Sequence, residues 1–239
     1  MKKMAVMILT AAIAMSVGST AFAAPSVQGG SDGYGAGLSD DNTDIGDDVW
    51  VEWNEFVEGE NLRKHSEETQ ELIKYINNLE KGVSVKKAFE DFNREYETKE
   101  TDNILDEETI LVFDTESDFV QEGFEYLDQM YFLSPMRDLV FYNIEPTPEK
   151  LIKVDFHALD LTDDMDVYVL YRCDTVEKKD QNGRKAGEKH GWELLEAERT
   201  GEEQDKQVTA CFHDDDSIAG LVYIDKSVKE KTEGTSPRT

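Results

Sequence analysis

Between residues 62 and 96, apolar side chains recur every three or four positions, which is the period of an amphipathic helix. The first stripe ends near Lys81-Gly82, and Gly82 suits the left-handed conformation that closes a helix. Ser84 can cap a second helix. We expect an antiparallel helical hairpin whose stripes pack together. The first stripe carries Leu62, Thr69, Leu72, Ile73, Ile76 and Leu79, and the second carries Val85, Ala88, Phe89, Phe92 and Tyr96.

A third helical pattern starts at Thr115, where Thr115 and Asp118 resemble a capping box. Gly123 interrupts this pattern, so a strand over part of the segment is the alternative. We assign residues 49–133 to a helical domain. The apolar positions of the third pattern are Phe119, Val120, Phe124, Leu127, Met130 and Tyr131.

From Ser134 onward the apolar period changes to alternation, which indicates strands. Six short runs are rich in Val, Ile, Tyr and Phe and are separated by turn residues: Leu139–Phe141, Leu151–Phe156, Asp166–Tyr171, Trp192–Leu195, Val208–Phe212 and Ile218–Ile224. Asn182-Gly183 marks the tip of a long polar hairpin. The pattern predicts an α+β chain, in which a small helical portion precedes an antiparallel, Ig-like β-sandwich over residues 134–225.

Residues 24–48 carry almost no apolar side chains and are predicted to form a flexible acidic linker. Three of its residues have the alternate spacing of a calcium loop: Asp40, Asn42 and Asp44. Gly46 falls one place too late for the sharp turn of such a loop, and Val51 stands where a bidentate Glu is required. We therefore interpret the segment as a solvated spacer.

Residues 1–23 have the order of a secretory signal peptide. Lys2 and Lys3 precede an apolar stretch that ends in small residues at Ala21-Phe22-Ala23. The apolar stretch is shorter than the roughly 20 residues that cross a bilayer, and no later segment approaches that length. We expect cleavage after Ala23, export, and no membrane span in the mature chain.

The chain is strongly acidic, with a formal charge of −28. Loss of Lys2 and Lys3 with the signal peptide leaves 23 of the 25 basic residues against 53 acidic ones, a charge of −30. Such a surface repels phosphate backbones and anionic lipids, so nucleic acid is excluded as a partner. Apolar and aromatic contents of 38% and 10% are enough to form a core.

Residues 226–239 are predicted to be a disordered tail, which ends in Ser236-Pro237-Arg238-Thr239. These four residues resemble the front of a Gram-positive cell-wall sorting signal of the Leu-Pro-x-Thr-Gly type, with Ser236 in place of Leu. The resemblance implies that a sortase joins Thr239 covalently to peptidoglycan and that the gene continues past Thr239. A secreted protein is the alternative.

A second resemblance spans residues 144–224, about a third of the chain. The segments that carry it are Val154–Leu170, His190–Leu194, Val208–Phe212 and Ile218–Tyr223. They are similar to a small β-sandwich module that occurs ahead of the sorting signal in clostridial surface proteins. This resemblance implies location and architecture, and it carries no catalytic signature.

Motifs for catalysis or cofactor binding are absent from the sequence: there is no phosphate loop, no Gly-x-Ser-x-Gly elbow and no His-Glu-x-x-His. We therefore assign no catalytic residue, no cofactor and no metal site. Trp50 and Trp53 can stack on sugars, although burial is the usual fate of Trp. Asp214, Asp215 and Asp216 can bind a cation, although a solvated turn is the commoner arrangement.

Cys173 and Cys211 have two specific interpretations. In an exported chain they favour a disulfide, which would stabilise the fold by roughly 4 kcal/mol. The alternative is a zinc site of Cys211 and His213 with His157 or His190, which lacks a closely spaced anchoring pair. Cys173 shares its parity with inward strand residues and Cys211 does not, so the thiols face opposite sides unless Cys173 lies beyond its strand.

Taken together, these patterns and the two resemblances imply a non-enzymatic, exported module of the Gram-positive cell surface that serves display or adhesion at the cell wall and has an unknown surface ligand. The alternative function is a secreted hydrolase or a carbohydrate-binding accessory protein. A cleft with two carboxylates roughly 5 to 10 Å apart would favour that alternative.

Overall fold

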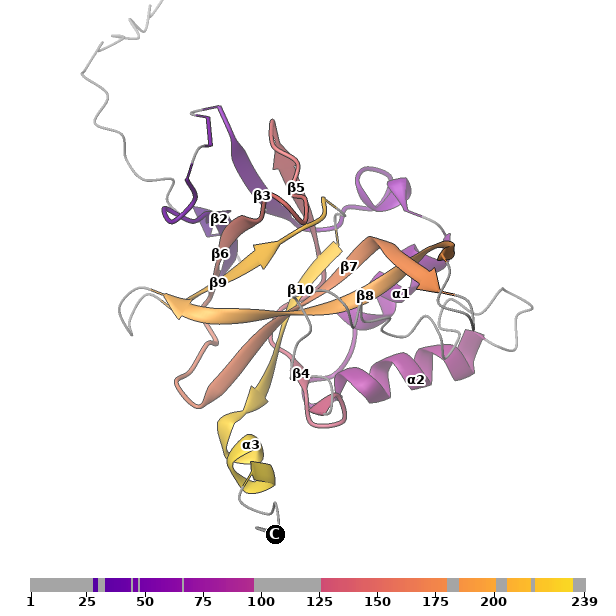
Figure 1. Ribbon diagram of the computed structural model, residues 1–239. Coiled ribbons are helices and arrows are strands. Elements are labelled where there is room, and N and C mark those ends of the chain that lie inside the picture. The colour runs from indigo at the N-terminus through magenta and orange to yellow at the C-terminus, as the bar shows by residue number, and fades with distance from the viewer. Residues whose placement is uncertain are drawn as a thin grey trace, which may run out of the picture.

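The computed structural model describes residues 28–29, 33–43, 45–46, 48–65, 67–96, 126–179, 185–200, 206–215 and 218–233 (Figure 1). In chain order the elements are β1 (Gln28–Gly29), β2 (Tyr34–Leu38), β3 (Trp50–Asn54), the 3-10 helix η1 (Leu62–Lys64), α1 (Glu67–Asn77), α2 (Val85–Tyr96), β4 (Tyr131–Phe132), β5 (Arg137–Tyr142), β6 (Ile152–Ala158), β7 (Met165–Lys179), β8 (Lys185–Thr200), β9 (Gln207–Phe212), β10 (Ile218–Asp225) and α3 (Lys226–Glu233).

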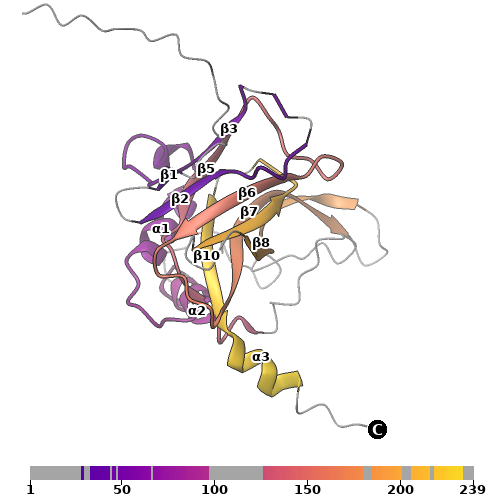
Figure 2. The same ribbon diagram turned by 90° about the vertical axis from the view of Figure 1, so that its left-hand side faces the viewer.

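All strands of the described segments join one antiparallel sheet in the order β1-β2-β6-β9-β8-β7-β10-β5-β3, with β4 paired to β10. The sheet curls until β2 and β3, near its two ends, lie side by side without a ladder between them (Figure 2). The predicted mixture of helices with a mostly antiparallel β fold is confirmed. The predicted sandwich of two packed sheets is not seen, because a single sheet that is nearly a closed barrel forms the interior core.

Alternate residues of the central strands supply two separate cores. Val167, Val169 and Tyr171 of β7 point into the barrel and pack with Leu195, Phe212 and other interior residues. Tyr168 and Leu170 point outward and are covered by α1 and α2, which lie on the same side of the sheet in both views. The described central parts of β7, β8 and β10 are therefore buried on both faces.

The helical prediction is confirmed for α1 and α2. Leu72, Ile73 and Ile76 of α1 are buried, as are Val85, Ala88, Phe89 and Phe92 of α2. The Ser84 hydroxyl accepts a hydrogen bond from the Lys87 amide at 3.3 Å, so Ser84 caps α2 as predicted. Gly82 has a φ of 89°, a left-handed conformation that disfavours other residues. Leu62 of the first stripe lies in η1, ahead of α1.

Three segments form elements that differ from the predicted organisation of the chain. Residues 34–38 of the expected linker form β2, which pairs with β6 and buries Ala36 and Leu38. Residues 50–54 of the expected helical domain form β3, which pairs with β5. Residues 226–233 of the expected tail form α3. Helices and strands thus share packed side chains and do not divide at residue 134.

The side chain of Asn42 holds the residues after β2 against β6. Its side-chain amide donates to the carbonyls of Ser39 and Lys153 at 2.9 and 2.8 Å, and its side-chain oxygen accepts from the Lys153 amide at 2.8 Å. Asn42 therefore extends the attachment of β2 to β6 beyond the ladder. Asp44 and residues 115–125 of the third helical pattern lie outside the described residues.

Candidate ligand-binding groove

The antiparallel pairing of β3 with β5 creates an outward face of mainly polar side chains. Val51 and Trp53 of β3 point into the barrel core, so Trp50, Glu52 and Asn54 point outward. The register sets these three residues opposite others on β5: Trp50 faces Tyr142, Glu52 faces Val140, and Asn54 faces Asp138.

Trp50 and Tyr142 form a stacked pair at one end of this face. Their ring centroids are 4.6 Å apart with an interplanar angle of 13°, and Trp50 remains 44% exposed. The Tyr142 hydroxyl donates to the Glu52 carboxylate at 3.1 Å, and the Asn54 amide donates to the same oxygen at 3.1 Å. Burial, followed by the bond to Glu52, raises the pKa of Tyr142 above its usual 10.0, so the phenol remains a donor.

The loop after β3 forms the opposite wall of a groove with a volume of about 640 Å³. Asn61 holds this loop in place: its side-chain oxygen accepts from the Val57 amide at 2.8 Å, and its amide donates to the Glu55 carbonyl at 3.0 Å. The side chains of Glu60, Asn61 and Lys64 line the groove beside Asp138, Val140 and Tyr142. Polar groups thus converge on an open volume of the size that small ligands occupy.

Asp138 is a largely buried acidic residue in the lining of the groove. The residue is only 3% exposed, and among the described residues its carboxylate makes no hydrogen bond or ion pair. Glu52 and Asp138 occupy diagonal positions of the ladder, a relationship that sets residues roughly 7 to 8 Å apart. Of the four acidic residues that line the groove, Glu52 accepts hydrogen bonds from Tyr142 and Asn54, whereas Asp138 accepts none among the described residues.

Arg137 supports the groove from the inner side of β5. Its guanidinium lies 5.4 Å from the Trp53 ring centroid and 5.6 Å from the Tyr34 ring centroid. It also donates to the Trp53 carbonyl at 3.4 Å and pairs with Glu55 at 3.4 Å.

The two tryptophans that were predicted to stack on sugars differ in their exposure. Trp53 is buried, with its indole donating to the Ala219 carbonyl at 3.1 Å, whereas Trp50 is available to a ligand.

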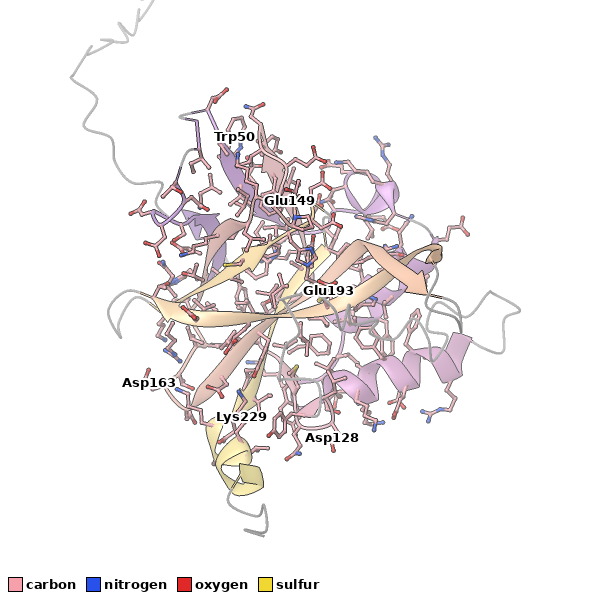
Figure 3. All side chains as sticks on the ribbon, viewed as in Figure 1. Trp50, Asp128, Glu149, Asp163, Glu193 and Lys229 are labelled. Atoms are coloured by element: carbon pink, nitrogen blue, oxygen red, sulfur yellow. The ribbon has the colours of Figure 1, made fainter. Side chains whose placement is uncertain are left out.

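A second polar cluster lies elsewhere on the barrel, where β8 meets the segment after β9 (Figure 3 labels Glu193). Glu193 and His213 are both 11% exposed at their side chains and approach to 2.7 Å. Burial alone lowers the pKa of His213, but the hydrogen bond to Glu193 and the charges of Glu193 and Asp214 outweigh burial, so the pKa lies above 6.5.

Among its described residues, the acidic turn beside this pair shows no ligand set for a cation. Asp214 is buried, and burial followed by the charges of Asp214 and Glu145 raises the pKa of Asp215. Asp216 lies outside the described residues. Within the part of the chain that the structure describes, no group of three or more His, Cys, Asp and Glu side chains is arranged to hold a metal ion.

The two cysteines lie far apart in the strand register. Cys211 on β9 carries a free thiol whose pKa is raised by burial. It is level with Tyr168 across β8, whereas Cys173 lies five residues further along β7. That offset is about 16 Å along the strand and about 10 Å across two strands, while a disulfide spans Cα atoms up to about 7 Å apart. This register argues against an intramolecular bridge. The side chains of Cys173 and His190 lie outside the described part.

Sequence reasoning missed Glu52, Asp138 and Tyr142; the one local signal was the alternation of Glu52 with the buried Val51 and Trp53 on β3, which the outward-facing Trp50 obscures. The signal peptide and Ser236-Pro237-Arg238-Thr239 lie outside the described residues.

No described helix is both long and apolar enough to span a membrane. Comparison with known proteins finds no matching family model, no match among curated proteins and no match among solved structures.

Proposed function

We propose that this chain is an exported, non-enzymatic module of a Gram-positive cell surface that presents the β3–β5 groove to a ligand. The single observation that carries the proposal is the position of the groove. Trp50, which stacks on the groove residue Tyr142, lies at one end of the molecule, and Lys229 of α3 lies at the opposite end (Figure 3). A chain tethered through its C-terminus would therefore hold the groove away from the point of attachment.

The contacts of α3 with the barrel support this orientation. Lys229 pairs with Asp166 of β7 at 2.9 Å, and its ammonium lies 5.2 Å from the Tyr168 ring centroid. Lys226 donates from its backbone to the Asp164 carbonyl at 2.8 Å and from its side chain to the Asp163 carbonyl at 2.7 Å. These bonds fix the direction in which the chain leaves the barrel.

Attachment would use the sorting-like residues Ser236-Pro237-Arg238-Thr239 and a sortase that joins Thr239 to peptidoglycan. The test is fractionation of the native host. We expect the protein in the peptidoglycan fraction until the wall is digested, and we expect Pro237→Ala to move it to the culture medium. The matched control is Thr235→Ala, which lies just ahead of the sorting-like residues and should leave the distribution unchanged. Recovery of all wild-type protein from the medium would refute anchoring.

A secreted glycoside hydrolase is the second candidate, and one observation favours it. Glu52 and Asp138 are diagonal neighbours, and their expected separation falls within the roughly 5 to 9.5 Å that separates the two carboxyl groups of glycosidases. A display module should release no reducing ends from neutral polysaccharides. Turnover that Glu52→Gln and Asp138→Asn both abolish would replace the display function with this one.

A further inference from the structure

We infer that the groove binds a neutral polysaccharide. One pyranose ring stacks on the Trp50–Tyr142 pair at the end of the groove, and hydroxyl groups of the polysaccharide donate to Asp138. This inference rests on the proposed role of the groove as the ligand site, and it adds the chemical class of the ligand.

The stacked pair provides a flat apolar surface for the ligand. An exposed indole that rests on a phenol is ordered before any ligand arrives, because Tyr142 is fixed by its bond to Glu52. Binding to it costs little side-chain entropy. A pyranose presents a face of C–H groups that matches such a ring, while its hydroxyls point sideways toward polar groups. Glu52 and Asn54 lie next to the pair on β3.

Asp138 provides the specific polar contact. A carboxylate whose oxygens accept no hydrogen bond from the protein has both oxygens open to the hydroxyl groups of a ligand. Among the described residues the Asp138 carboxylate accepts no hydrogen bond, and Asp138 lines the groove opposite Asn54. Two neighbouring sugar hydroxyls can donate to its two oxygens, and the Asn54 amide both donates and accepts.

The charge of the groove selects against anionic ligands. Glu52, Glu55, Glu60 and Asp138 line it against Lys64 and Arg137, and Arg137 is already paired with Glu55. The formal charge of −28 adds repulsion at longer range. A polyuronate or teichoic-acid-like chain is therefore disfavoured. A cationic peptide would meet the charge of Asp138, but it would gain nothing specific from the flat face of Trp50.

The experiment is calorimetric titration of the mature protein with neutral hexasaccharides of the cello, xylo, manno, malto and N-acetylchito series. Polygalacturonate is the anionic probe and pentalysine the cationic one. At least one neutral probe should bind, and Trp50→Ala and Asp138→Asn should each weaken its affinity at least tenfold. Leu151→Ala and Glu149→Gln change an exposed apolar and an exposed acidic residue elsewhere, and they should leave affinity unchanged. Thermal melts show whether each variant is folded.

Three results would overturn the inference: no neutral probe binds, binding survives Trp50→Ala in a folded variant, or pentalysine alone binds and depends on Asp138. The fractionation experiment gives an independent answer. Wall-bound protein that binds no glycan refutes the ligand class and leaves display intact. Glycan binding by a protein found entirely in the medium refutes anchoring and leaves the groove assigned.

Discussion

Asn77 and Met136 hold each other through two reciprocal hydrogen bonds. The Asn77 side-chain amide donates to the Met136 carbonyl at 3.0 Å, and its side-chain oxygen accepts from the Met136 amide at 2.7 Å. Asn77 is the last residue of α1, and Met136 directly precedes β5. This pair therefore joins the helical layer to the strand that carries Asp138 and Tyr142.

Replacement of Asn77 by Ala should lower the free energy of unfolding by about 2 kcal/mol, because two hydrogen bonds are lost and the Met136 backbone is left without these partners. Urea unfolding measures the change. Asn78→Ala is the matched control, since among the described residues the exposed Asn78 side chain donates only to the Lys74 carbonyl of α1, and its loss should cost less than about 0.5 kcal/mol. Equal effects of the two variants would show that the hydrogen bonds between Asn77 and Met136 contribute nothing to stability.

Leu38→Ala tests whether β2 belongs to the folded barrel. Leu38 is 2% exposed in the interior core, so its truncation should destabilise the protein by about 2 to 5 kcal/mol. Leu159→Ala removes the same atoms from a side chain that is 53% exposed and should change stability by less than about 0.5 kcal/mol. If thermal or urea unfolding shows no loss of stability in Leu38→Ala, the flexible linker predicted from the composition of residues 24–48 would be supported instead.

The raised pKa of His213 predicts a definite pH dependence of stability. A folded-state pKa above the ordinary 6.5 means that the pair with Glu193 stabilises the fold fully below about pH 6.5 and loses this contribution as the pH rises through the folded-state value. Wild-type protein should therefore lose stability relative to His213→Gln as the pH rises from about 6.5 through the folded-state pKa of His213. Parallel unfolding curves for the two proteins across this range would contradict the prediction. His157→Gln serves as the control histidine variant.

Thiol labelling of the denatured, unreduced protein tests the strand register. The positions of Cys173 and Cys211 lead us to expect two reactive thiols per chain, and Cys211→Ser should melt within about a degree of the wild type, since no bridge is lost. No reactive thiol together with a large drop in melting temperature would restore the disulfide predicted from the exported context. Loss of stability on chelation would point to zinc instead.

The elements predicted correctly are those with an unambiguous period. The stripes of α1 and α2 are regular, and the runs from β5 to β10 alternate, so both types are visible in the sequence. β2 was missed because Gly35 and Gly37 weaken a strand pattern, and only its pairing with β6 makes the segment a strand. β3 was missed because Trp50 is apolar yet faces outward, which hides the alternation of Val51 and Trp53.

The groove was less predictable than the helices. Trp50 was a candidate from its chemistry alone, but the contribution of Asp138 depends on the pairing of two strands that are distant in sequence. Alternation also identifies only which residues face inward, and it does so equally for a sandwich and for a barrel. The choice of a barrel depends on how β2 and β3 meet, which no local pattern records.

The attachment of β2 to β6 also sets the order in which the chain can fold. Asn42 and Lys153 are bonded across 111 residues, and the sheet reaches its final curvature only after these distant segments meet. Contacts of high sequence separation form slowly, whereas the α1–α2 hairpin needs only neighbouring residues. If the chain is exported from its N-terminus, β2 leaves the cell before β6 and cannot pair until β6 has also been exported. The slow step of folding should then be barrel closure, well after the helices have formed.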